Sequence, residues 1–220
     1  MKKWKIFAVV SCLCFVVAAC TGAAGFADET IRYKMTVTVE TPEGIKTGSA
    51  VREAVRHTEP SIFPEQGGAT YGLAKGEAIS INLGNRGYFF VLLGGELEAR
   101  LVFKGFKKKH NDGELVLQPN EYPRLVYFKD LKKPMTVQSI SQYPNKAMPD
   151  GYGGMSELLS DPFGEGTKIE SIAIATTSEP FTTNIGSLLG WLTSLKGGYL
   201  HGGPSSRGAP FGLHAGDFLR

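Results

Sequence analysis

Apolar and polar residues alternate without interruption near the start of the chain, from Ile31 to Glu40. A period of two is typical of a strand with one buried and one exposed face. Residues 41–44 (Thr-Pro-Glu-Gly) place Pro and Gly where a tight turn prefers them, and residues 45–56 form a second extended run. The pattern therefore predicts an antiparallel hairpin.

Several shorter runs farther along the chain also have the character of strands. Residues 77–83 alternate, whereas residues 88–93 are apolar throughout, which predicts a strand buried on both faces or a short helix. Between residues 96 and 104, apolar positions alternate with charged ones, and this predicts another strand. Three more strands are expected at residues 124–129, 135–140 and 168–177.

A single helix is predicted near residues 184–196. Asn184 is a suitable N-cap, and Ile185 and four leucines follow at helical spacing before Gly197 and Gly198 end the run. The two glycines inside this helix each weaken it by about 1 kcal/mol relative to alanine, so packing against the sheet must hold it.

Together these elements predict a mainly β fold of the β-rich α+β class. The expected architecture is an antiparallel sheet sandwich or barrel, with one packed helix. We expect a tether at residues 20–30, a β-rich domain at 31–196 and a glycine-rich tail at 197–220. Residues 57–76 are expected to form a long loop, and this loop and the tail are the predicted places for a partner site.

The first 19 residues have the pattern of a secretory signal peptide. Lys2, Lys3 and Lys5 precede an apolar stretch of 14 residues from Ile6 to Ala19. A membrane span needs about 20 apolar residues, so this stretch is short for one. Without these three lysines, the 24 basic residues are reduced to the number of acidic ones, 21. A neutral domain has no overall field that would attract nucleic acid, and none is predicted as a partner.

Val17-Ala18-Ala19-Cys20 resembles the lipobox of bacterial lipoproteins. The resemblance implies cleavage before Cys20 and acylation of its thiol, with palmitate among the acyl groups, so Cys20 is the predicted lipidation site. Cys12 and Cys14 would be removed with the signal, and the mature chain could have no internal disulfide. A membrane-anchored lipoprotein of the cell envelope is implied, in the outer membrane if the host has one, because Thr21 replaces the Asp that signals inner-membrane retention.

Two alternatives for the N-terminal segment stay open. Cleavage near Ala24 or Ala27 would release a soluble secreted or periplasmic protein. Residues 6–27 also contain no charge and could remain as an uncleaved anchor, although their second half is only weakly apolar.

Three segments resemble parts of a family of uncharacterised bacterial exported proteins: RYKMTVTVETPEGIKTGSAV, the block IATTSEPFTTNIGSLLGWL, and the closing GDFLR. The resemblance implies that the chain contains one genuine domain. It implies no activity and assigns no role to any residue.

Candidate catalytic and metal-binding residues are few. His201, His214 and Asp217 would form a metal site with an unusual gap, but no H-x-x-x-H or C-x-x-C spacing supports it. Ser205 or Ser206 with these residues would supply the residue types of a hydrolase triad, but the G-x-S-x-G motif is absent. The other two histidines of the chain are His57 and His110. We therefore predict no catalytic, cofactor-binding or metal-binding residue and no cofactor, and interpret the two histidines of the tail as surface residues.

Two glycine-rich segments are considered as phosphate-binding loops, and one basic cluster as a membrane-binding surface. Residues 68–75 and 164–168 lack the complete phosphate-loop motif and are interpreted as turns. Lysines at 104 and 107–109 precede an Asn-Asp-Gly turn signal, which predicts an exposed hairpin tip with a weak attraction to anionic membrane. The aromatic residues that could line a ligand pocket are instead expected in the core; they are Phe89, Phe90, Trp191, Tyr199 and Phe211.

The function that these observations favour is that of a non-enzymatic, membrane-tethered envelope lipoprotein. It would act as a binding or structural module with an envelope protein as partner. The alternatives are a soluble secreted hydrolase that uses the tail histidines, and a carrier whose sheet closes around an apolar ligand.

Overall fold

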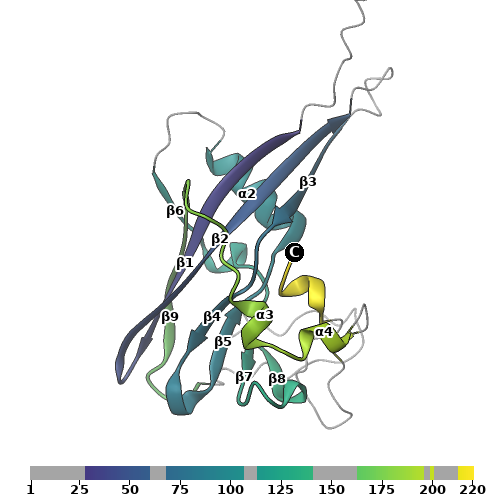
Figure 1. Ribbon diagram of the computed structural model, residues 1–220. Coiled ribbons are helices and arrows are strands. Elements are labelled where there is room, and N and C mark those ends of the chain that lie inside the picture. Colours follow the sequence, from purple (N-terminus) through teal and green to yellow (C-terminus); the bar gives the residue numbers. More distant parts are fainter. Residues whose placement is uncertain (1–27, 60–67, 107–112, 141–162, 196–198, 201–212) are drawn as a thin grey trace, which may run out of the picture. The chain divides into compact units, whose positions relative to one another are not determined.

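A computed structural model describes residues 28–59, 68–106, 113–140, 163–195, 199–200 and 213–220 (Figure 1). The predicted signal peptide, Cys20 and most of the tether lie outside these residues. The chain forms two compact units, one of residues 1–28 and 57–69 and one of residues 29–56 and 70–220. In the first unit, Asp28 Oδ1 and His57 Nδ1 lie 2.6 Å apart. The second unit contains the core of the protein.

The predicted hairpin is confirmed and forms the centre of a five-stranded sheet. Its strands pair from Glu29 opposite Arg56 to Thr41 opposite Gly44, with Gly44 at a φ of 116° in the turn. The strand order is β3-β2-β1-β9-β6. The bounds are β1 Glu29–Thr41, β2 Gly44–Glu59, β3 Gly68–Lys75, β6 Glu114–Val116 and β9 Lys168–Thr176.

A second antiparallel sheet has the order β4-β5-β7-β8. Its strands are β4 Ile79–Asn82, β5 Tyr88–Val91, β7 Leu125–Phe128 and β8 Val137–Ile140. All four residues of β7 are buried, and three of the four in β5 are buried too. The apolar run at residues 88–93 is therefore a strand covered on both faces, one of the two structures expected for it.

Two hydrophobic cores follow from this double coverage. Phe89 and Val91 on one face of β5 pack with Met35 and Val37 of the first sheet. Phe90 of β5 and Phe128 of β7, on the opposite face of the second sheet, pack with Phe218 near the C-terminus. The molecule therefore contains the first sheet with its helix, the second sheet, and a C-terminal layer over the outer face of the second sheet.

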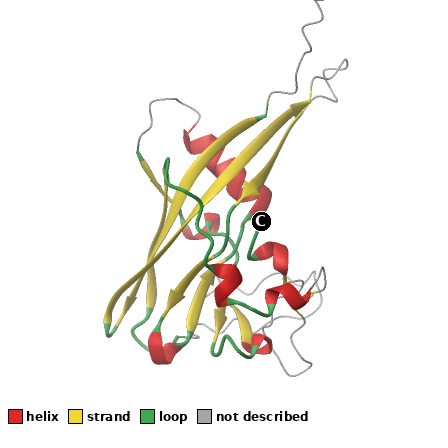
Figure 2. Ribbon diagram, in the orientation of Figure 1, coloured by secondary structure: helices red, strands yellow, loops and turns green. Residues whose placement is uncertain are grey.

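The strand predicted for residues 96–104 is wrong, because this segment is the long helix α2, Gly95–Phe106 (Figure 2). Some of the apolar residues that alternate in the sequence also fit the spacing of a helix. The side chains that are buried lie along one side of a helix; they are Glu98, Ala99, Val102 and Phe103. Acidic residues in the first turn and Lys104 in the last suit the helix dipole. Of the lysines assigned to an exposed hairpin tip, Lys104 lies on α2, and residues 107–112 lie outside the described residues.

The helix predicted near residues 184–196 is interrupted. It consists of two single turns, α3 Ile185–Leu188 and α4 Leu192–Leu195, on either side of Gly190. The Asn184 side chain makes no capping hydrogen bond. Ile185 of α3 and Leu192 of α4 are buried in the second core, as the expected dependence on packing requires, whereas Leu188 is exposed. The described residues also form four 3-10 turns: η1 Gly84–Arg86, η2 Pro119–Glu121, η3 Pro134–Thr136 and η4 Ala215–Asp217.

The loop expected at residues 57–76 is wrong at both ends. β2 continues to Glu59, and Gly68–Lys75 is strand β3. Glycine and alanine are both depleted in strands, and four residues of Gly68–Lys75 are glycine or alanine, so the pairing of β3 could not be predicted from this segment alone.

The last residues of the chain are part of the fold. β11 Leu213–His214 pairs with β10 Tyr199–Leu200, and Phe218 is fully buried. The backbone of residues 217–220 then bonds to Gly76, Ala78 and Leu93, which closes the second core. Mainly antiparallel strands with few helices confirm the predicted β-rich α+β class.

The two sheets approach each other closely at Gly48. A Cβ atom at this position would lie 2.8 Å from Cγ1 of Ile81 and 2.9 Å from the carbonyl oxygen of Ser80, both in β4. We expect Gly48→Ala to lower the free energy of unfolding by about 1–3 kcal/mol, because β4 must move to admit the methyl group. Urea denaturation monitored by circular dichroism measures the change. Gly68→Ala in β3, where nothing lies within 4 Å of the new atom, is the matched control. Equal stability of the two variants would contradict this close approach.

Candidate functional site

A charged network lies between α2 and the two sheets. Arg52 of β2 is fully buried, and Glu98 of α2 is 2% exposed. Arg52 Nη1 lies 2.7 Å from Glu98 Oε1, and the Tyr33 hydroxyl of β1 donates to the same oxygen. The other carboxylate oxygen of Glu98 accepts the Gly94 amide at 2.7 Å. One carboxylate therefore joins β1, β2 and the start of α2.

The remaining donors of Arg52 bind backbone carbonyl groups. Nη2 donates to Val91 at 3.0 Å, Nη1 to Leu92 at 3.4 Å and Nε to Glu77 at 3.0 Å. A buried guanidinium is tolerated only when its charge is paired and its donors are satisfied. Both conditions are met, so the network connects the first sheet to β5 as well as to α2.

Tyr33 serves this network as a proton donor. Its burial, followed by the nearby negative charge of Glu98, raises the pKa of the phenol well above its ordinary value. The hydroxyl therefore stays protonated over the physiological range and continues to donate to the carboxylate. Since Tyr33, Arg52 and Glu98 are all shielded from solvent, this arrangement orients structural elements and presents no group to a substrate.

Glu77 extends the network toward the C-terminal layer. Its carboxylate is buried and accepts the backbone amides of Asn184 at 3.0 Å and Ile185 at 2.8 Å. Its own carbonyl group accepts Arg52 Nε. The start of α3 is thus capped by a carboxylate more than a hundred positions away in the sequence. The side chain of the predicted N-cap Asn184 takes no part in this cap.

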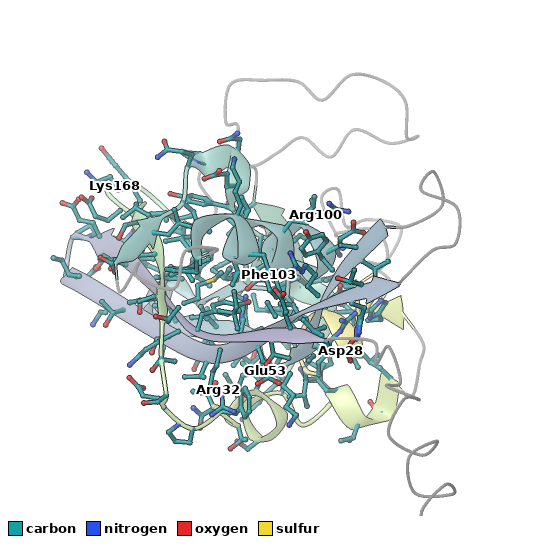
Figure 3. All side chains as sticks on the ribbon, turned by 90° about the horizontal axis from the view of Figure 1, so that it is seen from above. Asp28, Arg32, Glu53, Arg100, Phe103 and Lys168 are labelled. Carbon is teal, nitrogen blue, oxygen red and sulfur yellow. The ribbon has the colours of Figure 1, made fainter. Side chains whose placement is uncertain are left out.

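Residues 177–184, which we call the strap, carry the chain from β9 across the outer face of the first sheet. Lys34 of β1 pairs with Glu179 at 3.0 Å. The Phe181 ring lies 4.3 Å from the Arg32 guanidinium and 5.4 Å from Lys75 Nζ. Figure 3 shows Arg32 and Glu53 on the face of β1 and β2 turned away from α2, and Phe103 and Arg100 on the side of α2. The strap is therefore a half-exposed surface feature that carries both charge and an aromatic ring.

A second aromatic group lies on the α2 side of the sheet. Tyr71 of β3 and Phe103 of α2 meet edge to face with ring centroids 5.7 Å apart. Arg100 stacks over Tyr71 at 4.6 Å, and Arg56 lies over Phe103 at 5.8 Å. Arg100 also pairs with Glu96, and Arg56 with Glu29, so these cations are engaged within the domain.

The structure brings together two of the residues considered for a triad or metal site. Asp217 Oδ2 lies 3.6 Å from His214 Nδ1, but it accepts the backbone amide of His214 at the shorter distance of 2.8 Å. The carboxylate therefore caps the turn η4. His110, His201, Ser205 and Ser206 lie outside the described residues.

The other candidate groups have structural positions. Residues 68–75 form a strand and not the turn expected there, whereas residues 164–168 do make a turn, with positive φ at Gly164 and Gly166. Phe89 and Phe90 are in the core as predicted, and Trp191 packs against the second core and donates its indole N–H to Leu131. Phe211 is outside the described part of the chain.

Comparison with protein-family models, curated proteins and solved structures finds no match to this chain. Within the described ranges, no group of three His, Cys, Asp or Glu side chains is arranged to hold a metal ion. Of the helices in those ranges, none combines the length and apolar character needed to cross a bilayer.

Sequence reasoning did not identify the buried network. Arg52 belongs to a predicted strand, but its pairing opposite Tyr33 becomes meaningful only once the hairpin register is known. The alternating pattern at residues 96–104 predicts that Glu98 lies on the exposed face of a strand, whereas this segment is a helix and Glu98 is buried. One available signal was the inward position of Arg52 between Ala50 and Ala54, since a charge in a buried row needs a partner.

We expect Arg52→Met and Glu98→Leu to lower the free energy of unfolding by about 3–5 kcal/mol each, because each leaves an opposite charge buried without its partner. The double variant should lose less than the sum of the two, because no unpaired ion remains. Urea denaturation of the three variants tests this. Glu96→Gln, which removes the exposed pair with Arg100 on α2 and leaves Arg100 over Tyr71, is the control and should change stability by no more than about 0.5 kcal/mol. Strict additivity would contradict the coupling.

The raised pKa of Tyr33 predicts a pH dependence of stability. The unfolded chain loses the Tyr33 proton above about pH 10, whereas the folded protein keeps it, so stability falls as the pH rises through this range. We expect Tyr33→Phe to be less stable at neutral pH and to show a shallower loss between pH 9 and pH 11. Unfolding free energies measured across that interval give both slopes, and identical slopes would argue against a buried protonated phenol.

Proposed function

We propose that this protein is a lipid-anchored, non-enzymatic binding or structural module of the bacterial cell envelope. The observation that carries the proposal is the lipobox Val17-Ala18-Ala19-Cys20 at the end of a charged and then apolar leader. Cys20 is the last cysteine of the sequence, so acylation would use the single thiol of the mature chain.

The position of the domain supports a role close to the membrane. β1 begins at Glu29, nine residues after Cys20. Nine residues span about 30 Å at most when fully extended. A domain held on so short a tether works within about 30 Å of the bilayer, where partners are other envelope proteins or the lipid itself.

The contacts made by the buried charged residues favour a binding protein over an enzyme. Arg52, Glu77 and Glu98 are the described charged residues with almost no exposure, and their side chains bind backbone groups or each other. An enzyme keeps such groups at a surface where substrate can reach them. An apolar ligand between α2 and the first sheet would have to displace this network, so the described core also favours a binding surface over an enclosed carrier site.

Cys20→Ser should abolish metabolic labelling by an alkyne-tagged palmitate analogue, because the acylated thiol is absent. Cys14→Ser, a matched change within the apolar stretch, should leave labelling intact. Labelling is measured by click chemistry on the immunoprecipitated protein. Undiminished labelling of Cys20→Ser would overturn the lipid anchor.

The binding role is tested in the same cells by chemical crosslinking of the anchored protein. A discrete crosslinked species that is lost with Cys20→Ser is expected, because the partner is met at the membrane. Monomer alone in both strains would contradict a role in an envelope complex.

A further inference from the structure

The strap is attached firmly at its ends and weakly in its middle. At one end the Thr177 amide bonds to the Arg32 carbonyl group, and at the other the Glu77 carboxylate holds Asn184 and Ile185. Between these points, the Lys34–Glu179 pair is exposed to solvent on both sides, and such pairs contribute little. The Thr182 hydroxyl accepts the Val51 amide at a long distance of 3.4 Å.

The sheet surface beside the strap is apolar in its centre and basic at its margins. Val51 is 1% exposed, although its position opposite Lys34 places it on the face turned away from the main core. Val55 lies on the same face and is 9% exposed. Arg32, Lys34 and Lys75 surround this strip, and only Lys34 meets a carboxylate of the strap.

Arg32 has unused hydrogen-bonding capacity on this surface. Its pair with Glu53 is long, at 3.7 Å. Its Nε atom is buried and has no hydrogen-bond partner among the described residues. Leaving a buried donor unsatisfied is unfavourable, so a carboxylate brought close to Arg32 would gain a strong charge-assisted contact.

We propose that the outer face of β1, β2 and the end of β3 is a docking surface for an extended peptide segment of a partner protein, and that the strap covers this surface until the segment displaces it. The inference rests on the proposed binding function and names the chemistry of the partner. That segment carries a carboxylate two residues before an aromatic ring. Glu179 and Phe181 of the strap have this spacing and occupy the same cations in its absence.

Charge complementarity selects this occupant. The carboxylate of the segment is attracted by Lys34 and by the unsatisfied Nε of Arg32, and its ring takes the place of Phe181 between Arg32 and Lys75. An extended peptide also offers the backbone or hydroxyl acceptor that the Val51 amide needs. The strap is therefore a competitor within the chain, and it lowers the affinity for any segment that lacks the full pattern.

Hydrogen exchange at the Val51 amide reports displacement of the strap, because Thr182 is its partner. On the full chain in detergent micelles, we expect Val51 to exchange at least 100-fold faster than Val37, which lies in the middle of the sheet. Glu179→Gln/Phe181→Ala should accelerate Val51 about tenfold more and leave Val37 unchanged. Glu96→Gln/Leu97→Ala on the exposed side of α2 is the matched control and should change neither rate.

Equal protection of Val51 and Val37 in the wild-type protein, unaltered in the strap variant, would show that the strap is a fixed part of the fold and would overturn the proposal. This outcome leaves the lipid anchor untouched, since acylation of Cys20 is measured separately. The wild-type comparison needs no variant, so a folding defect in the double variant does not prevent the test.

The docking itself is tested with a synthetic peptide of sequence TSEPFTTN, which copies residues 177–184. Fluorescence anisotropy of the labelled peptide should show binding to Glu179→Gln/Phe181→Ala at least ten times tighter than to the wild-type chain, where the strap competes. A peptide with Lys and Ala in place of the Glu and Phe should not bind, and adding Arg32→Ala to the strap variant should abolish binding. No binding of TSEPFTTN to the strap variant, or equal binding of both peptides, would overturn the proposal.

Discussion

The buried ion pair between Arg52 and Glu98 determines how the parts of this domain meet. Arg52 lies in the middle of a long hairpin, and Glu98 lies in the first turns of the helix that covers it. Two ions removed from water remain stable only if each keeps its partner and its hydrogen bonds. Glu98 therefore holds Tyr33 and Gly94 in place, and Arg52 holds the carbonyl groups of Glu77, Val91 and Leu92. No apolar contact in the core imposes such strict geometry, because dispersion and the hydrophobic effect have no direction.

Glu77 connects the Arg52–Glu98 network to the C-terminal layer. Its carbonyl group belongs to the Arg52 network, while its carboxylate holds the start of α3 and its backbone pairs with Leu219. α3 and α4 are single turns that would not be stable alone. They persist because they cover Phe90 and Phe128 on the outer face of the second sheet. The second core thus depends on contacts that begin in the first, and the strap is the segment that connects the two.

These relationships separate the groups that maintain the fold from those available for function. The described charged residues with the least exposure, Arg52, Glu77 and Glu98, all make structural contacts. A partner would therefore be bound by residues at the surface. On this surface the strap carries an aromatic ring and exposed charge. It lies over three cations of the sheet, Arg32, Lys34 and Lys75, and its carboxylate pairs only with Lys34. Lipid anchoring would hold this surface near the membrane, and a weakly held cover would keep it from binding segments of the wrong chemistry. Anchor and surface are independent parts of one proposal about a module that binds in the envelope.

The sequence by itself determined the hairpin, the apolar strand at residues 88–93 and the β-rich class, because unbroken alternation from Ile31 to Glu40 and a fully apolar run each admit few structures. It also contains Val17-Ala18-Ala19-Cys20, whose resemblance to a lipobox is a local feature of the sequence. The helix at Gly95–Phe106 was decided by tertiary structure: its apolar residues suit a strand as well, and only a partner for Glu98 in the core selects the helical stripe. The strand at Gly68–Lys75, the split of the final helix and the capping by Glu77 were decided in the same way. In each case the stabilising partner lies far away in the chain, and local pattern carries no information about which distant residues will meet.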